Sequence, residues 1–148
     1  MNNISITSLL EGKGRTVHAV PANVSVFEAV QKMNQHRIGA ILVMNGDSLA
    51  GIFTERDVLT RVIATNLDPK VALIRQVMTE NVTTVEPEAT VQQVMDIFAE
   101  KRCRHLPVVR NGGLVGVISI GDVSRWIANL HQAEAESLRQ YVAGALST

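Results

Sequence analysis

The sequence predicts an α+β fold in which two tandem strand–helix–strand–strand–helix units pack as a pseudo-twofold pair, with further helices at both ends. Three observations support this prediction. The chain aligns with itself once, without gaps, at an offset of 65 residues. Each copy shows the same order of strand-type and helix-type patterns. One such unit is too small to bury its own apolar sheet face, so two units are expected to cover each other.

The internal repeat rests on matching chemistry as well as on identity. Residues 16–58 align with residues 81–123, and nine of the 43 aligned positions are identical. Elsewhere one apolar residue mostly replaces another, as Leu106 replaces Ile41. The two segments are therefore expected to fold alike.

Each copy is expected to open with a short strand, at 16–20 and 81–85, followed by a turn marked by proline. Next comes a Ser/Thr residue with Glu or Gln three positions later, in Ser25–Glu28 and in Thr90–Gln93. This spacing is a capping box and predicts a helix in each copy.

Two further strands and a second helix complete each unit. The turns between the strands, 45–47 and 111–113, contain the Asn and Gly residues that a hairpin favours. The second helices are expected to begin near Asp57 and Asp122. The strands are expected at 40–44 and 51–53 in the first copy, and at 106–109 and 114–118 in the second.

These patterns divide the chain into a first repeat, a linker, a second repeat and a C-terminal helix. Another short helix is expected in the first dozen residues. The C-terminal helix carries more apolar side chains than a solvated helix end needs, which predicts a homodimer that covers them. The predicted boundaries are 8–63, 64–75, 76–130 and 131–148.

Composition limits the classes of partner. Lys plus Arg and Asp plus Glu each number 14, so the chain lacks the basic excess typical of nucleic-acid binding. Aromatic residues make up only 3%, which disfavours a base-stacking surface. No apolar run approaches the length of a membrane span, and residues 1–8 lack the pattern of a signal peptide. We therefore expect a cytoplasmic protein without a nucleic-acid or membrane partner.

Candidates for catalysis are weak. Cys103 and His105 share one face of an expected strand, but the sequence offers no third supporting group for a nucleophile pair. The four histidines lack the spacing of a metal site. We expect no catalytic residue, no metal site and no catalytic cofactor.

The most suggestive motif is a hydroxyl residue followed three positions later by aspartate, in Thr54–Asp57 and Ser119–Asp122. Each copy lies where a strand ends and a helix begins. A carboxylate there can accept bonds from both hydroxyls of a ribose, and the helix N–H groups can hold a phosphate. The same spacing also serves as a plain helix cap. Its occurrence in both copies favours ligand binding.

These motifs resemble the CBS repeat, named for cystathionine β-synthase. The resemblance rests on the order Ser-Val-Phe-Glu-Ala, Ile-Gly-Ala-Ile-Leu-Val and Gly-Ile-Phe-Thr-Glu-Arg-Asp-Val in the first copy. The second copy has Arg-His-Leu-Pro-Val-Val and Gly-Val-Ile-Ser-Ile-Gly-Asp-Val. The chain is similar to bacterial stand-alone pairs of this family. The resemblance implies a regulatory module that binds AMP, ATP, NAD(H) or S-adenosylmethionine-like ligands between its repeats.

The resemblance also implies that each ligand is shared between the acidic motif of one repeat and the strand entry of the other. One expected site consists of Ser119, Gly121 and Asp122 with Lys13, Thr16, Val17, His18, Ile38, Gly39 and Ala40. The other consists of Thr54, Arg56 and Asp57 with Asn81, Val82, Thr83, Arg104, His105 and Pro107. The small pair Gly39-Ala40 leaves room for a base, whereas Arg104-His105 is bulky and cationic and suits phosphates. The sites are expected to differ in ligand, or only one is filled.

The leading hypothesis is a sensor in which an adenine nucleotide shifts the arrangement of the paired repeats and an unidentified downstream protein reads the change. The alternative is a structural or partner-binding module whose nucleotide sites are vestigial. A nucleotide hydrolase is the third possibility, but the residues 13–15 lack the pattern of a phosphate-binding hydrolase loop.

Overall fold

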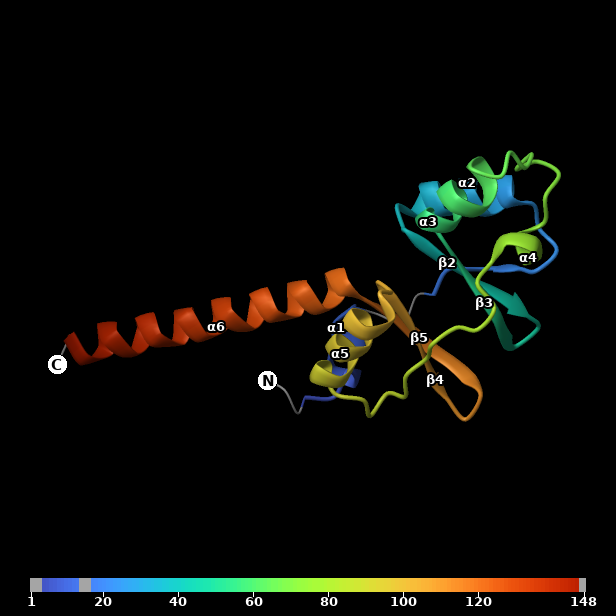
Figure 1. The fold of residues 1–148 in the computed structure, drawn as a ribbon. Coiled ribbons are helices and arrows are strands. Elements are labelled where there is room, and N and C mark those ends of the chain that lie inside the picture. The colour runs from blue at the N-terminus through green and yellow to red at the C-terminus, as the bar shows by residue number, and fades with distance from the viewer. Residues whose placement is uncertain (1–3, 14–16, 147–148) are drawn as a thin grey trace.

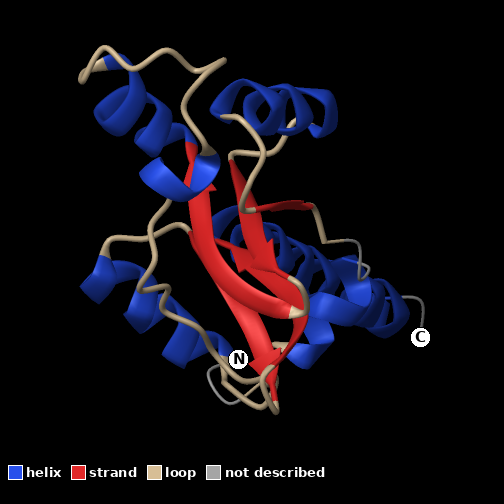
Figure 2. Ribbon diagram, turned by 90° about the vertical axis from the view of Figure 1, so that its right-hand side faces the viewer, coloured by secondary structure: helices blue, strands red, loops and turns tan. Residues whose placement is uncertain are grey.

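The computed structural model describes residues 4–13 and 17–146. It shows the expected mixed α+β arrangement, with two small sheets and flanking helices (Figure 1). Figure 2 shows the strands of both sheets running through the middle of the molecule, with helices on either side.

The first repeat contains a three-stranded sheet in the order β1-β2-β3. Strand β1 pairs in parallel with β2, and β2 pairs antiparallel with β3. Its elements are β1 (Ala19–Pro21), α2 (Val26–His36), β2 (Ala40–Asn45), β3 (Ser48–Thr54), α3 (Glu55–Asp57) and the π-helical segment η1 (Val58–Ile63).

The second repeat contains a two-stranded antiparallel sheet of β4 and β5. Its elements are α5 (Val91–Lys101), β4 (His105–Arg110), β5 (Gly113–Ser119) and α6 (Ile120–Leu146). The short helices α1 (Thr7–Lys13) and α4 (Ile74–Val77) precede the second and complete the first repeat in space, as described below.

The strand predicted at 81–85 is wrong: this segment forms only one parallel bridge, between Val85 and Val108. In the first repeat the Leu42 N–H donates to the His18 carbonyl at 3.2 Å, next to the β1–β2 ladder. The residue equivalent to Leu42 is Pro107, which has no N–H to donate. The extended segment therefore loses a ladder bond and its pairing shrinks to a bridge.

The helix caps follow the predicted chemistry. The Thr90 hydroxyl accepts from the Gln93 N–H at 3.1 Å, and the Gln93 side chain accepts from the Thr90 N–H at 2.9 Å. This is a complete capping box at the start of α5. At the start of α2 the structure shows the first half of the box, since the Ser25 hydroxyl accepts from the Glu28 N–H at 3.1 Å.

Each repeat has its own core, and each core includes a segment that precedes the other repeat. Buried residues of α4, such as Ile74 and Val77, pack into the core of the first repeat. Buried residues of α1, such as Leu9 and Leu10, pack into the core of the second. The two units are therefore interlocked, and the region between them contributes apolar surface to the first core.

Main-chain bonds repeat this relationship in both halves. The Ile74 N–H donates to the Val24 carbonyl at 2.9 Å, and the Ile6 N–H donates to the Ala89 carbonyl at 2.9 Å. The α1 and α4 segments are thus equivalent under the pseudo-twofold relation. Through this relation α1 is held against β5, which brings its last residue, Lys13, next to the start of α6.

Helix α6 is 27 residues long and extends well beyond the two repeats (Figure 1). Its first turns pack on α1, α5 and β5, whereas the side chains at 131–144 are all exposed. Within the described residues, no helix combines the length and apolar character that a membrane span requires.

Candidate functional site

A cleft of about 440 Å³ lies where the two repeats meet. Its walls come from the start of β2 and the segment before β1 in the first repeat, and from β5 and the first turns of α6 in the second. The last residue of α1 closes one side. The lining residues are Lys13, Val17, His18, Arg37, Ile38, Gly39, Ala40, Leu42, Ile52, His105, Val117, Ser119, Asp122 and Arg125.

The polar centre of this cleft is a helix cap. Ser119 ends β5, and Asp122 lies in the first turn of α6. The Ser119 hydroxyl accepts from the Asp122 N–H at 3.1 Å, and an Asp122 carboxylate oxygen accepts from the Ser119 N–H at 2.8 Å. These reciprocal bonds hold the carboxylate in one position at the cleft wall.

Two cations pair with the Asp122 carboxylate, which is only 7% exposed. Lys13 Nζ lies 2.7 Å from Oδ2, and Arg125 Nη2 lies 2.5 Å from Oδ1. Burial alone would raise the pKa of Asp122, but the Lys13 ammonium and the Ser119 N–H outweigh it, and the pKa is lowered. The group therefore stays ionised, and Oδ1 keeps a lone pair for another donor such as a ribose hydroxyl.

Histidines add to the cationic character of the cleft. The pKa of His18 is lowered by burial and then by the neighbouring His36, Lys32 and Lys13. The pKa of His105 is lowered by burial first and then by Lys13. A bound anion would relieve the repulsion that lowers both values, so the cleft favours a negatively charged ligand.

His18 also supplies a flat surface. Its ring stacks on that of His36, with the centroids 3.9 Å apart and the planes 22° from parallel. This stacking holds the His18 ring at the cleft wall, where it can lie against a planar heterocycle.

The start of β2 supplies space, because Gly39 and Ala40 carry the smallest side chains. The Gly39 carbonyl accepts from the Glu55 N–H at 3.0 Å, so this backbone is fixed. Gly121 lies on the opposite side, where an added Cβ would be 3.6 Å from the Ser119 hydroxyl oxygen. The small residues allow a ligand to approach the backbone closely.

Most of the first predicted set meets in this cleft. Gly121 lies beside it, next to Ser119 and Arg125. Thr16 lies outside the described residues. The members that line the cleft are Lys13, Val17, His18, Ile38, Gly39, Ala40, Ser119 and Asp122.

The second predicted set is placed differently. His105 lines the first cleft instead, because its strand β4 pairs with β5 and sets it opposite Ser119. Val82 lines a separate hollow of about 310 Å³ with Leu49 and Leu114. Arg56, Asn81 and Arg104 are exposed, Thr83 is half-buried, and the buried Pro107 uses its carbonyl to accept from the Val85 N–H at 3.0 Å.

Thr54 and Asp57 form a cap like that of Ser119 and Asp122. Asp57 Oδ2 accepts from the Thr54 N–H at 3.0 Å, and the Thr54 hydroxyl accepts from the Asp57 N–H at 3.3 Å. The cation near this carboxylate is Arg61, with Nε 3.5 Å from Oδ1. The two motifs are therefore structurally equivalent, but only the second lines the cleft described above.

Sequence reasoning missed two arginines of the cleft, Arg37 and Arg125. Arg125 follows Asp122 by three residues on a helix, a spacing that places both side chains on one face and was readable from the sequence. Arg37 ends α2 in the left-handed conformation, with φ 53°. Its place in the cleft depends on how the repeats pack, which local patterns do not reveal.

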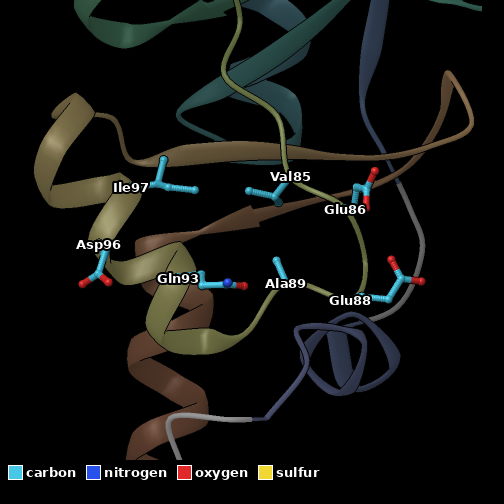
Figure 3. A pocket seen from close by; sticks show the side chains of 7 residues that line it. All are labelled: Val85, Glu86, Glu88, Ala89, Gln93, Asp96 and Ile97. Carbon is cyan, nitrogen blue, oxygen red and sulfur yellow. The ribbon is translucent and has the colours of Figure 1, made fainter.

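A larger hollow of about 530 Å³ lies in the second repeat, away from the cleft (Figure 3). Val85, Ala89 and Ile97 form its apolar floor, and the acidic side chains of Glu86, Glu88 and Asp96 lie around it. Carboxylates repel a phosphate group, so this hollow is unsuited to a nucleotide.

Cys103 is half-buried, and burial raises the pKa of its thiol. A raised pKa reduces the thiolate fraction at neutral pH, so the surroundings of Cys103 do not activate it as a nucleophile.

Comparison with known proteins agrees with this architecture. The CBS domain family model matches residues 14–64 and 74–129. CBSX3, a mitochondrial CBS domain-containing protein of Arabidopsis thaliana, is 34% identical over 95% of this chain and 72% of its own length.

Solved structures agree as well. A CBS-domain protein from Agrobacterium tumefaciens superposes with a TM-score of 0.79 at 38% identity, covering 82% of this chain and 98% of that one. A CBS domain protein from Pyrobaculum aerophilum, in complex with AMP, gives a TM-score of 0.72 at 27% identity, covering 80% and 89%. The chain belongs to the CBS domain family and contains two CBS repeats.

Proposed function

We propose that this protein is a regulatory module that binds an adenine nucleotide in the cleft between its two repeats. The observation that carries the proposal is the convergence of Ser119, Asp122 and Lys13 with His18 and Gly39 in one cavity of about 440 Å³. The AMP complex of the relative from Pyrobaculum aerophilum supports an adenine nucleotide as the ligand class.

The cleft offers a partner for each part of such a ligand. The ribose hydroxyls donate to Asp122, whose carboxylate is ionised and fixed by its cap. The phosphate pairs with Lys13 and Arg125, which already lie on either side of that carboxylate. The base lies near Gly39 and the His18 ring. The cleft would also accept ATP or NAD(H), because all of these ligands share the adenosine and its first phosphate.

Binding in this proposal has a regulatory outcome and no chemical step. The ligand touches residues of both repeats and of α1, so it stabilises the arrangement in which these parts meet. A homodimer and an unidentified downstream protein would read that change. Cytoplasmic location, the exclusion of a nucleic-acid partner and the role of the Thr54–Asp57 set stay predictions of the sequence.

Thermal unfolding with added ligand tests the proposal, using Asp122→Ala and its structural equivalent Asp57→Ala as a matched pair. Both variants lose a helix cap, but only Asp122 lines the cleft. AMP, ATP, NADH and S-adenosylmethionine are each added at millimolar concentration. We expect at least one to raise the Tm of the wild type and of Asp57→Ala, and to leave Asp122→Ala unchanged. The absence of any shift in the wild type would instead support a structural module with vestigial sites.

A further inference from the structure

The projecting half of α6 is a helix face without apolar cover in the described structure. Residues 131–146 extend roughly 24 Å beyond the repeats at 1.5 Å per residue (Figure 1). Leu138, Tyr141 and Val142 are 63%, 76% and 47% exposed. An isolated helix of this length is only marginally stable in water. Its stability therefore calls for a surface that covers this apolar face.

The apolar side chains of α6 follow one face along its whole length. Ile120, Ile127, Leu138 and Val142 are separated by seven, eleven and four residues, spacings close to whole helical turns. The polar pair His131 and Glu134 interrupts this face near its centre, with His131 Nδ1 3.6 Å from Glu134 Oε2. The face thus has an apolar segment at each end and one pair of opposite polarity in the middle.

The geometry points to a second copy of this chain as the occupant, bound through antiparallel pairing of the two α6 helices. With the twofold axis between residues 132 and 133, His131 of each copy faces Glu134 of the other. The same register sets Ile127 opposite Leu138 and Ser124 opposite Tyr141. A parallel arrangement would instead set His131 against His131 and Glu134 against Glu134, so charge complementarity favours the antiparallel one.

The receiving surface is present on the same chain. A hollow of about 320 Å³ lies between α5 and the first turns of α6, and its lining includes Met95, Ile120, Ser124 and Ile127. Met95 and Ile120 are 39% and 40% exposed. In the proposed register, Tyr141 and Val142 of one copy reach this hollow of the other, and the twofold axis repeats the contact. The interface is therefore closed and limits assembly to a dimer.

This inference gives the proposed homodimer a surface, but it does not depend on nucleotide binding. Sedimentation velocity of the full chain tests the face. We expect a dimer for the wild type and a dissociation constant raised about tenfold or more by Leu138→Ala with Tyr141→Ala, since both anchors are lost. Gln132→Ala with Gln140→Ala, on the other side of α6, is the matched control and should leave the dimer intact. A monomeric wild type, or a dimer unaffected by loss of Leu138 and Tyr141, would overturn the inference.

Cross-linking tests the register. In a Cys103→Ser background, chains carrying Ser124→Cys are mixed with chains carrying Tyr141→Cys and treated with a short bismaleimide reagent. We expect cross-linked dimers in the mixture and none with either variant alone. Cross-linking of either variant alone would show parallel pairing and contradict the proposal. A Tm shift with AMP in the Leu138/Tyr141 double variant would show nucleotide binding without the dimer, so the two proposals can fail separately.

Discussion

Asp57 and Asp122 occupy equivalent positions in the two repeats, yet their surroundings give them different capacities. Both cap the helix that follows a strand, and both are nearly buried, at 6% and 7% exposure. Asp122 also meets Lys13, which reaches it from the other end of the chain. That contact depends on the packing of α1 against the second repeat, and it makes Asp122 part of a charged cleft.

Lys13 is expected to stabilise the fold through its two short hydrogen bonds, to Asp122 Oδ2 and to the Val117 carbonyl, both at 2.7 Å. Lys13→Met should lower the free energy of unfolding by about 1–3 kcal/mol near neutral pH. The pKa of Asp122 is lowered in the folded state, so its contribution is present above its unfolded pKa and is lost as the pH falls through the folded pKa. Urea unfolding of both proteins should therefore show a difference at pH 7 that shrinks below about pH 4. A difference independent of pH would contradict this account.

His105 is expected to make the fold less stable in mild acid. Its pKa is lowered in the folded state by burial and by Lys13, so the unfolded chain takes up the proton first as the pH falls below about 6.5. The free energy of unfolding should then decrease with falling pH, by at most about 1.4 kcal/mol per pH unit for this group. Urea unfolding between pH 7.5 and 5.5 measures this slope, and His105→Gln should reduce it. An unchanged slope in His105→Gln would show that other groups set the pH dependence.

At the scale of elements, the patterns in the sequence predicted most helices and strands because the forces that form them are local. The capping box at Thr90 and the hairpin turn at Asn111 and Gly112 act within a few residues, and both are present. In that turn Asn111 and Gly112 have φ of 52° and 78°, as a two-residue hairpin loop requires. The strand at 81–85 failed because its partner residue is Pro107, a long-range effect that alignment with the first copy concealed.

Gly51 shows what the repeat conserves between its copies. A Cβ at Gly51 would lie 2.7 Å from the Thr79 carbonyl oxygen, and one at the equivalent Gly116 would lie 2.9 Å from Leu10. Thus each glycine lets the α4 or α1 segment lie directly on the strand. The sequence marked the pair as identical but did not reveal the segment that covers it.

Gly51→Ala should therefore destabilise the protein by about 1–3 kcal/mol, because the added methyl group meets fixed backbone. Gly12→Ala is a suitable control, since nothing lies within 4 Å of a Cβ at Gly12. Chemical denaturation of the two variants measures the difference. A Gly51→Ala protein as stable as the control would contradict the close packing of α4 on β3.

At the scale of the whole molecule, the cleft depends on how the repeats interlock. The residues of the first predicted set were grouped correctly in space as far as the structure describes them, because the resemblance supplied the pairing of one repeat's acidic motif with the other's strand entry. The second set was predicted by symmetry, but the cores are not symmetric in detail. His105 replaces Ala40 and lies in the first cleft, and the loss of a strand at 81–85 changes the second entry.

The central claim is that each chain binds one adenine nucleotide in the cleft at Asp122. Calorimetric titration of the purified, ligand-free protein with AMP measures the number of sites directly. The account predicts one AMP per chain, retained in Asp57→Ala and abolished in Asp122→Ala. No binding to the wild type, or binding that survives in Asp122→Ala and is lost in Asp57→Ala, would contradict it.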